Sequence, residues 1–514
     1  MYCFTSSEAA SPPPDSGHAA EMKREPLRFA ISCCTAQRMV FRAAMSKTGN
    51  NDVHNCCNFT GRFKRNFTCR FAHQNFSLFH FSSMATRTSS VERLLQYIRI
   101  PSVSGDGPKG AYNECAVWLT GYLEVGLKVQ IFSPSDNKPI VLATWQGKDP
   151  SLPSILLNSH YDVVPVAREH WQHDPFNPTV QEDGMIYGRG IQDMKSVGVQ
   201  YVEAVSRLKG EGFIPSRNIH LLFVPDEEIG GVDGMEAFIA SEQYKSIQPV
   251  AFALDEGLAN PNDAFTVFYG ERVPWWFYVK ATGPTGHGSR FIKNTATSKI
   301  IDVCNKALAF RVEQEALLSA DCGCKHGDIK KRNLGDVTTV NLNMLRSGVS
   351  QDGGKTHALN VIPTEAVAGF DVRISPGMDL KKLKASNNVA MLDEWCSAEG
   401  LSWEFVSWWK NPLHEHYTTS VDDTNIWWKL FKEGCEDIGI PLETEVFPAA
   451  TDSRFLRQLG IPALGFSPMN KTEILLHEHN ERLHKDTFLR GIDVYETLFR
   501  RMFTYVDIDP EFRL

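Results

Sequence analysis

The stretch "SILLNSHYDVV", residues 154–164, decides the fold that we expect for this chain. It begins as an apolar run of strand length and ends with a histidine and an aspartate at alternate positions, His160 and Asp162. Side chains two positions apart project from the same face of a strand. Both can therefore point into a crevice at the strand's carboxyl end, where open α/β sheets place their ligands. A histidine alone at such a place is more often a structural residue, so the interpretation depends on its neighbours.

Strand-like and helix-like patterns alternate on both sides of this stretch. A helix-length segment follows it at residues 193–212, and three further apolar runs have strand length: "PIVLATW", "NIHLLFVP" and "VAFALDEG". The pattern returns near the C-terminus, with a helix near 423–437 and another from about 485 to 504. Alternation of this kind predicts an α/β fold with a mostly parallel sheet.

Between these two parts the order of elements changes. Residues 271–410 show the order strand, helix, strand, strand, helix, strand, which is that of a split ferredoxin-like unit. We therefore predict a small α+β domain at 271–410. It would be inserted into a larger α/β domain, whose first part is 84–270 and whose second part is 411–514.

Residues 1–83 form a poorly patterned N-terminal extension. From Leu27 to Ser83 the only acid is Asp52, against eight Lys or Arg. An Arg-containing, acid-poor leader fits an organelle targeting segment. The alternative that we favour is an extension that is disordered or not translated, with synthesis beginning at Met84.

Composition limits the function classes for this chain of 514 residues. The net charge of -8 argues against a nucleic-acid partner, because no basic excess is present to neutralise phosphates. No stretch approaches the ~18 uncharged apolar residues of a membrane-spanning helix, so we expect no membrane partner. Six of the twelve cysteines lie within the first 69 residues, and the sparse remainder suits a reducing compartment. We therefore expect a cytoplasmic protein.

Acidic residues recur at the ends of the predicted strands. Glu227 and Glu228 follow the strand in "FVPDEEIGG", and Asp255 and Glu256 end another in "LDEG". Asp193 stands at the start of the long helix, where an isolated aspartate would usually be an N-cap. Because acid or histidine recurs at one strand end after another, we favour a shared site over a series of separate structural roles.

Such a set of carboxylates needs compensation, because buried like charges repel and lose hydration. One histidine with several carboxylates suits divalent metals, zinc first. Asp193, Glu227, Glu228 and Glu256 would bring four negative charges to one pocket. Two ions about 3.5–4 Å apart balance this charge better than one and form a standard hydrolytic pair.

Several motifs together resemble the aminoacylase/carboxypeptidase family of dinuclear-zinc amidohydrolases. They are "HYDVVPV", "GRGIQDMKS", "VPDEEIGG", "ALDEG" and "LLHEHNERLH". The resemblance runs from about residue 88 to the C-terminus. It implies zinc-dependent hydrolysis of N-acyl-L-amino acids to a carboxylate and a free L-amino acid. A dipeptidase or carboxypeptidase on the same scaffold and a non-catalytic binding homologue are the alternatives.

The resemblance implies five ligands for two zinc ions. His477 is chosen over His479 because the family's ligand precedes "NE" by three residues, as in "HEHNE". The implied ligands are His160 and Glu256 for one ion, Glu228 and His477 for the other, and Asp193 as the bridge between them.

Two further residues of the larger domain would serve catalysis. Asp162 would hydrogen-bond His160 and fix its orientation and tautomer. Glu227 would be the general base that takes a proton from the attacking water and later gives it to the leaving amine.

The small domain resembles the family's dimerisation lid, which implies a homodimer. His287 in "GPTGHGSRF" would reach the partner's active site and stabilise the oxyanion. Asn360 in "LNVIP" and Arg373 in "FDVRISP" would hold the substrate, with Arg373 on its α-carboxylate. Without the resemblance, His287 would be interpreted as a turn residue and Arg373 as a strand-face salt bridge.

Two features receive no functional role. "CGCKH", with Cys322, Cys324 and His326, lacks the second ligand pair of a zinc finger, so we interpret it as a loop. Asp226, the first acid of "DEE", has no predicted role beyond a hydrogen bond near the turn.

Overall fold

The structure is a computed structural model. It describes residues 89–106, 109–124, 126–319, 332–378, 380, 384–385, 388–406 and 415–506. The N-terminal extension at 1–83 and the Cys322, Cys324 and His326 motif lie outside the described residues.

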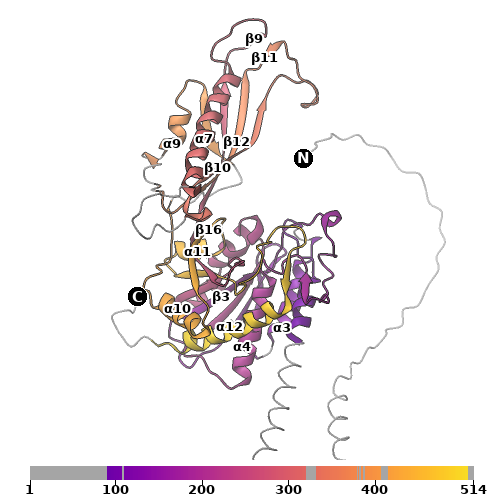
Figure 1. Cartoon of the computed structure of the whole chain (residues 1–514), viewed down its shortest axis with the longest axis vertical. Coiled ribbons are helices and arrows are strands. Elements are labelled where there is room, and N and C mark those ends of the chain that lie inside the picture. Colours follow the sequence, from indigo (N-terminus) through magenta and orange to yellow (C-terminus); the bar gives the residue numbers. More distant parts are fainter. Residues whose placement is uncertain are drawn as a thin grey trace, which may run out of the picture. The chain divides into compact units, whose positions relative to one another are not determined.

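An eight-stranded mixed sheet forms the larger α/β part (Figure 1). Its strand order is β1-β2-β5-β3-β6-β17-β7-β16, and the four consecutive strands β5, β3, β6 and β17 run parallel. The strands are β1 (Lys128–Ser135), β2 (Lys138–Trp145), β3 (Ser154–His160), β5 (Ile219–Val224), β6 (Val250–Asp255), β7 (Phe265–Glu271), β16 (Leu442–Phe447) and β17 (Ala463–Phe466). The predicted α/β fold with a mostly parallel sheet is confirmed, although β1, β7 and β16 were not predicted.

Helices cover both faces of this sheet, which explains why β3 and β5 are buried along their whole length. One face packs against four helices: α3 (Tyr112–Leu123), α4 (Lys195–Gly210), α10 (Ile426–Ile438) and α12 (Lys485–Thr504). The other face packs against α5 (Ala237–Ile239), α6 (Glu242–Ile247) and α11 (Ser453–Gln458). The sheet is therefore rigid, and its carboxyl edge holds side chains in fixed positions.

A second sheet has four antiparallel strands in the order β10-β12-β8-β15. The strands are β8 (Val273–Thr282), β10 (Thr339–Ser347), β12 (Glu365–Ile374) and β15 (Leu401–Phe405). Two helices, α7 (Ala296–Ser319) and α9 (Ala390–Trp395), contribute apolar side chains to the core on this sheet. The chain order is strand, helix, strand, strand, helix, strand, as predicted for a ferredoxin-like unit. The domain boundaries at 84, 270 and 410 remain predictions.

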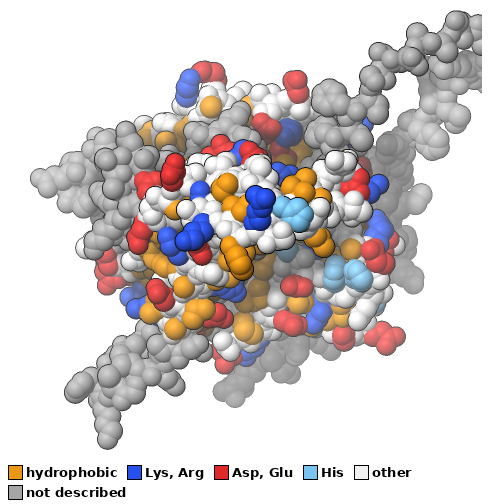
Figure 2. Space-filling view, turned by 90° about the horizontal axis from the view of Figure 1, so that it is seen from above, with side chains coloured by type: hydrophobic (Ala, Val, Ile, Leu, Met, Phe, Trp, Pro, Cys, Tyr) orange, Lys and Arg blue, Asp and Glu red, His pale blue; other side chains and the backbone are white. Residues whose placement is uncertain are grey.

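Surface and hydropathy agree with the composition of the chain. Acidic and basic side chains are mixed on the face shown in Figure 2, in contrast to the continuous basic surface typical of a nucleic-acid-binding protein. No helix among the described residues is long and apolar enough to cross a membrane.

Candidate metal centre

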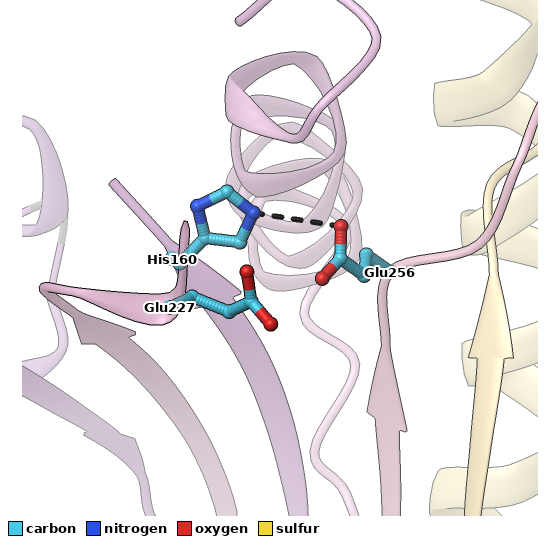
Figure 3. Close-up of side chains that lie close together, drawn as sticks. All are labelled: His160, Glu227 and Glu256. Atoms are coloured by element: carbon cyan, nitrogen blue, oxygen red, sulfur yellow. Dashed lines mark ion pairs between the residues drawn. The ribbon is translucent and has the colours of Figure 1, made fainter. Parts of the chain in front are cut away.

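Three parallel strands end at the same edge of the large sheet and deliver the predicted residues there. His160 is the last residue of β3 and lies opposite Val224, the last residue of β5. The turn after β5 carries Glu227, and Glu256 directly follows β6. The side chains of His160, Glu227 and Glu256 converge in Figure 3. These side chains meet because the parallel strands that carry them end side by side, as predicted from the sequence.

His160 lies at the centre of the first group. Its side chain is fully buried, and its Nε2 atom lies 2.9 Å from Asp193 Oδ1 and 3.4 Å from Glu256 Oε2. The potential ligand atoms of His160, Glu227 and Glu256 all lie within 4.8 Å of one another. These three side chains are therefore close enough together to share one cation.

His477 belongs to a second group beside the first. Its Nε2 atom lies 2.9 Å from Glu228 Oε2 and 3.1 Å from Asp193 Oδ2. Asp193 thus directs one carboxylate oxygen toward each of the two histidines. The His477 side chain is half exposed, with a relative accessibility of 50%, whereas that of His160 is 0%.

Three of the four carboxylates of this cluster have a raised pKa, whereas at Asp193 hydrogen bonds with the two histidines outweigh burial and lower the pKa well below its usual range. Burial raises the pKa of Glu228 to about 7, and the charge of Asp193 adds to the effect. Burial also raises the pKa of Glu227 and of Glu256 well above the usual range, helped by neighbouring carboxylates. Without cations, the cluster therefore reduces its negative charge by keeping protons.

The histidines respond in the opposite direction. Burial lowers the pKa of His477, but hydrogen bonds with Asp193 and Glu228 outweigh it and raise the pKa to about 10. Burial also lowers the pKa of His160, but the negative charge of Glu256 outweighs it. The pKa of His160 therefore rises well above its usual value. Both imidazoles therefore favour their protonated, cationic form while no metal is bound.

These residues fit a pair of divalent ions. The donor set contains two imidazoles and several carboxylates, which suits zinc and similar metals. The Oε1 atom of Glu228 is buried, and no hydrogen-bond partner for it is found among the described residues. An unsatisfied carboxylate oxygen in a cluster with surplus negative charge is the environment that a cation would complete.

Asp162 contacts His160 mainly through its backbone. The Nδ1 atom of His160 lies 2.9 Å from the Asp162 carbonyl oxygen and 3.6 Å from the carboxylate Oδ1. Because a carbonyl can only accept, Nδ1–H donates, and Nε2 is left as the ring nitrogen that faces the cluster and could bind a cation after losing its proton. The Asp162 carboxylate instead accepts from the backbone N–H groups of Glu227 and Glu228, at 3.2 and 3.3 Å. Asp162 therefore orients both the histidine and the acidic turn.

Asp226 bends the chain so that the two glutamates enter the cluster. Its backbone adopts the left-handed conformation, with φ 62°, which Asp tolerates better than most residues. Its buried carboxylate accepts from the Tyr112 hydroxyl at 2.7 Å and forms an ion pair with Lys138. These partners lie far away in the sequence, which is why no role was predicted for Asp226.

Two further buried carboxylates were also missed. Glu481 accepts hydrogen bonds from the segment that carries Asp193, including the N–H group of Gln192 at 2.6 Å. Asp452 is fully buried, and burial together with the charge of Asp255 raises its pKa to about 7. A sequence signal existed for Glu481, because it is the acid of the "NE" pair that identifies His477.

The three residues predicted in the segment 271–410 make contacts of their own. His287 on β9 (Gly286–His287) is exposed, and its Nδ1 lies 2.8 Å from Ser289 Oγ. Asn360 is exposed beside β11 (Val361–Ile362), and its carbonyl accepts from the Gly288 N–H at 2.8 Å. Their catalytic and substrate-binding roles stay predictions.

Arg373 on β12 forms the strand-face salt bridge that was the alternative interpretation. Its Nε and one terminal nitrogen donate to the two oxygens of Asp371 at 2.8 and 3.2 Å, and its guanidinium lies over the Trp276 ring. A guanidinium has five N–H donors. The pairing with Asp371 therefore fixes its orientation and uses only part of its capacity.

Comparisons with known proteins agree on one family. Residues 156–501 match the family described as Peptidase family M20/M25/M40. The chain is 47% identical over 412 residues to aminoacylase-1 of Mus musculus, covering 80% of this chain and 94% of that protein.

Two solved structures share the fold at low identity. One is an M20 family metallo-carboxypeptidase, Sso-CP2 from Sulfolobus solfataricus, with a TM-score of 0.60 and 19% identity, covering 80% of this chain and 98% of that chain. The other is described as a dinuclear metal-binding peptidase of the M20 family from Bacillus subtilis, with a TM-score of 0.56 and 13% identity, covering 81% and 98%.

Metal binding should release protons and strengthen with rising pH. The pKa of His477 is about 10 and that of Glu228 about 7 without metal, so both carry protons at acidic pH that a metal must displace. Zinc affinity should rise by about tenfold per pH unit for each displaced proton. It should rise more steeply below pH 7, where Glu228 adds to His477. Competition titrations with a chelator from pH 6 to 9 would measure this rise.

His479→Ala is the matched control, because His479 is exposed two residues from His477. This variant should keep the affinity and its pH dependence. The assignment of His477 as a ligand would be contradicted by a zinc affinity that does not change with pH. It would also be contradicted if His479→Ala lost its affinity for zinc.

Proposed function

This chain belongs to peptidase family M20/M25/M40, and we propose that it hydrolyses N-acyl-L-amino acids to a carboxylate and a free L-amino acid. The predicted resemblance to the aminoacylase/carboxypeptidase family is confirmed, and the chain is a metallohydrolase that acts on amides. The observation that carries the proposed reaction is the convergence of two histidines and four carboxylates at one sheet edge, in a chain so similar to aminoacylase-1.

The proposed cofactor is a pair of zinc ions. His160 and Glu256 would hold one ion, Glu228 and His477 the other, and Asp193 would contact both. The side-chain contacts support this division, because His160 pairs with Glu256 and His477 pairs with Glu228. When bound, zinc supplies Lewis acidity toward the scissile carbonyl and lowers the pKa of a coordinated water toward about 7.

Glu227 is the proposed general base. Glu256, rather than Glu227, forms the ion pair with His160 (Figure 3). Glu227 therefore lies beside His160 and Glu256 while a different carboxylate pairs with the histidine. Its raised pKa, caused first by burial, suits a group that takes a proton from water and returns it to the leaving amine.

Substrate recognition would come from residues of the predicted small domain. Arg373 would bind the substrate α-carboxylate through donors that Asp371 does not use, and Asn360 would add a polar contact. An acidic site needs a fixed cation to accept an anionic substrate, and a guanidinium binds carboxylate in a bidentate manner.

We further propose a homodimer in which His287 acts in the partner's active site as an oxyanion donor. The edge strand β10 and helix α7 support an interface, because Ile301, Leu308 and Val312 of α7 are exposed at helical spacing on one flank. A cytoplasmic location is proposed because the described cysteines, such as Cys115 and Cys435, are free thiols.

A dipeptidase or carboxypeptidase is the alternative, since the same fold occurs in a metallo-carboxypeptidase. The pair N-acetyl-L-methionine and glycyl-L-methionine separates the two functions, because the substrates differ mainly by one amino group. We expect kcat/KM to be at least about tenfold higher for the acetyl substrate, because the proposed activity is that of an aminoacylase. Dialysis against a chelator should abolish turnover and added zinc should restore it. Faster cleavage of the dipeptide would favour the alternative.

Glu227→Gln should lower kcat by about 10²–10⁴-fold while leaving the zinc content at two ions per subunit, because the amide cannot move a proton. Metal analysis and steady-state kinetics would measure both. Glu478→Gln is the control, since Glu478 is an exposed acid beside His477. A Glu227→Gln enzyme that kept most of its turnover would rule out the base assignment.

His287→Ala should lower kcat by about 10²–10³-fold, the usual loss for one oxyanion donor. If this histidine acts across the dimer, heterodimers of His287→Ala and Glu227→Gln subunits contain one complete site out of two. Co-expression with two affinity tags and purification of verified heterodimers should then restore activity. Inactive heterodimers would count against a histidine supplied by the partner.

A further inference from the structure

We propose that Glu481 and Arg189 form a buried clamp that positions Asp193 and His477 for metal binding. This inference rests on the two-metal centre proposed above. Neither clamp residue is among the proposed ligands, so both act through other residues. The clamp joins two segments that are distant in sequence, 189–193 and 473–482.

The carboxylate of Glu481 holds the segment that carries Asp193. Its side chain is fully buried, and Oε2 accepts from Arg189 Nη1 at 2.8 Å and from the Gly190 N–H at 3.0 Å. Oε1 accepts from the N–H groups of Gln192 at 2.6 Å and Asp193 at 3.3 Å. Both oxygens are thus committed to one short segment, whose last residue is the proposed bridge.

The guanidinium of Arg189 continues the clamp to the second segment. Its Nη2 donates to the carbonyl oxygen of His477 at 3.3 Å, while Nη1 contacts Glu481. His477 has a left-handed backbone, with φ 63°, which is uncommon for residues other than glycine. The face of the guanidinium lies over the Trp171 ring, 5.2 Å from its centroid. The ring helps to fix the orientation of both arms.

Gln192 adds a parallel connection between the same segments. Its Nε2 donates to the carbonyls of Glu473 at 3.0 Å and Arg482 at 2.8 Å, and its Oε1 accepts from the Leu475 N–H at 3.0 Å. The His477 loop is therefore held from both sides. Through these bonds, the 3.1 Å separation between Asp193 Oδ2 and His477 Nε2 depends on groups outside the cluster.

Stability alone is a weak reason for such a pair. A buried ion pair costs desolvation, and well-packed apolar residues often stabilise a protein as well or better. Apolar residues, however, could not accept from three backbone N–H groups and donate to a carbonyl at the same time. The hydrogen-bonding pattern therefore indicates a positioning role.

Two variants of the full-length protein test the clamp. Glu481→Gln keeps the shape but cannot accept at both oxygens, and Arg189→Lys keeps the charge but cannot span both partners. Each should weaken zinc binding by about 10–100-fold in chelator competition, the usual effect of losing a residue that orients ligands. Each should also change the visible absorption spectrum of the cobalt-substituted protein. Glu478→Gln, an exposed acid on the same loop, should change neither.

The outcomes distinguish a failure of the clamp from a failure of the two-metal centre. If the unaltered protein binds two ions and both variants match it in affinity and cobalt spectrum, the clamp is refuted, even if the variants melt at lower temperature. If the unaltered protein binds fewer than two ions, the two-metal centre fails instead. Should Glu481→Gln not fold, as judged by circular dichroism, the more conservative Arg189→Lys decides the question.

Discussion

Mutual repulsion among buried carboxylates is the constraint on which the rest of the structure depends. Asp193, Glu227, Glu228 and Glu256 meet at one edge of the large sheet, where burial removes most of their hydration. Parallel strands alone would not keep such groups together. Three features resist their separation. They are the backbone N–H groups that donate to Asp162, the left-handed backbone of Asp226, and the buried carboxylate of Glu481 behind the cluster. The surrounding fold thus stabilises an arrangement that is unfavourable until cations complete it.

The central fold could be predicted because its signals are local. The strands β3 and β5 are buried on both faces, so they appear in the sequence as continuous apolar runs. The missed strand β7 is also a buried run, which was not recognised in the sequence. The other two missed strands carry weaker signals: no residue of β1 is buried, and β16 contains two glutamates in six residues. Their assignment depends on pairing with β2 and β7, which propensity does not encode.

The residues of the site could likewise be predicted only in part. Residues at the ends of apolar strands could be found, and the resemblance added His477. The supports could not be found, because Tyr112 and Lys138 reach Asp226 across long stretches of sequence. The Arg373–Asp371 pair shows the opposite case, since residues two apart on one strand share a face and their contact was expected as the alternative. For Asp162 the sequence indicated the correct neighbour, but the stronger contact with His160 uses the backbone carbonyl.

The distance in sequence between the two histidines has a consequence for biosynthesis. His160 leaves the ribosome early, whereas His477 and the loop that holds it are made close to the C-terminus. A nascent chain therefore presents the acidic edge before the residues that complete it exist, and domains generally fold from the N-terminus during synthesis. A chain that stops before His477 would therefore lack one proposed ligand and with it one side of the proposed metal pair.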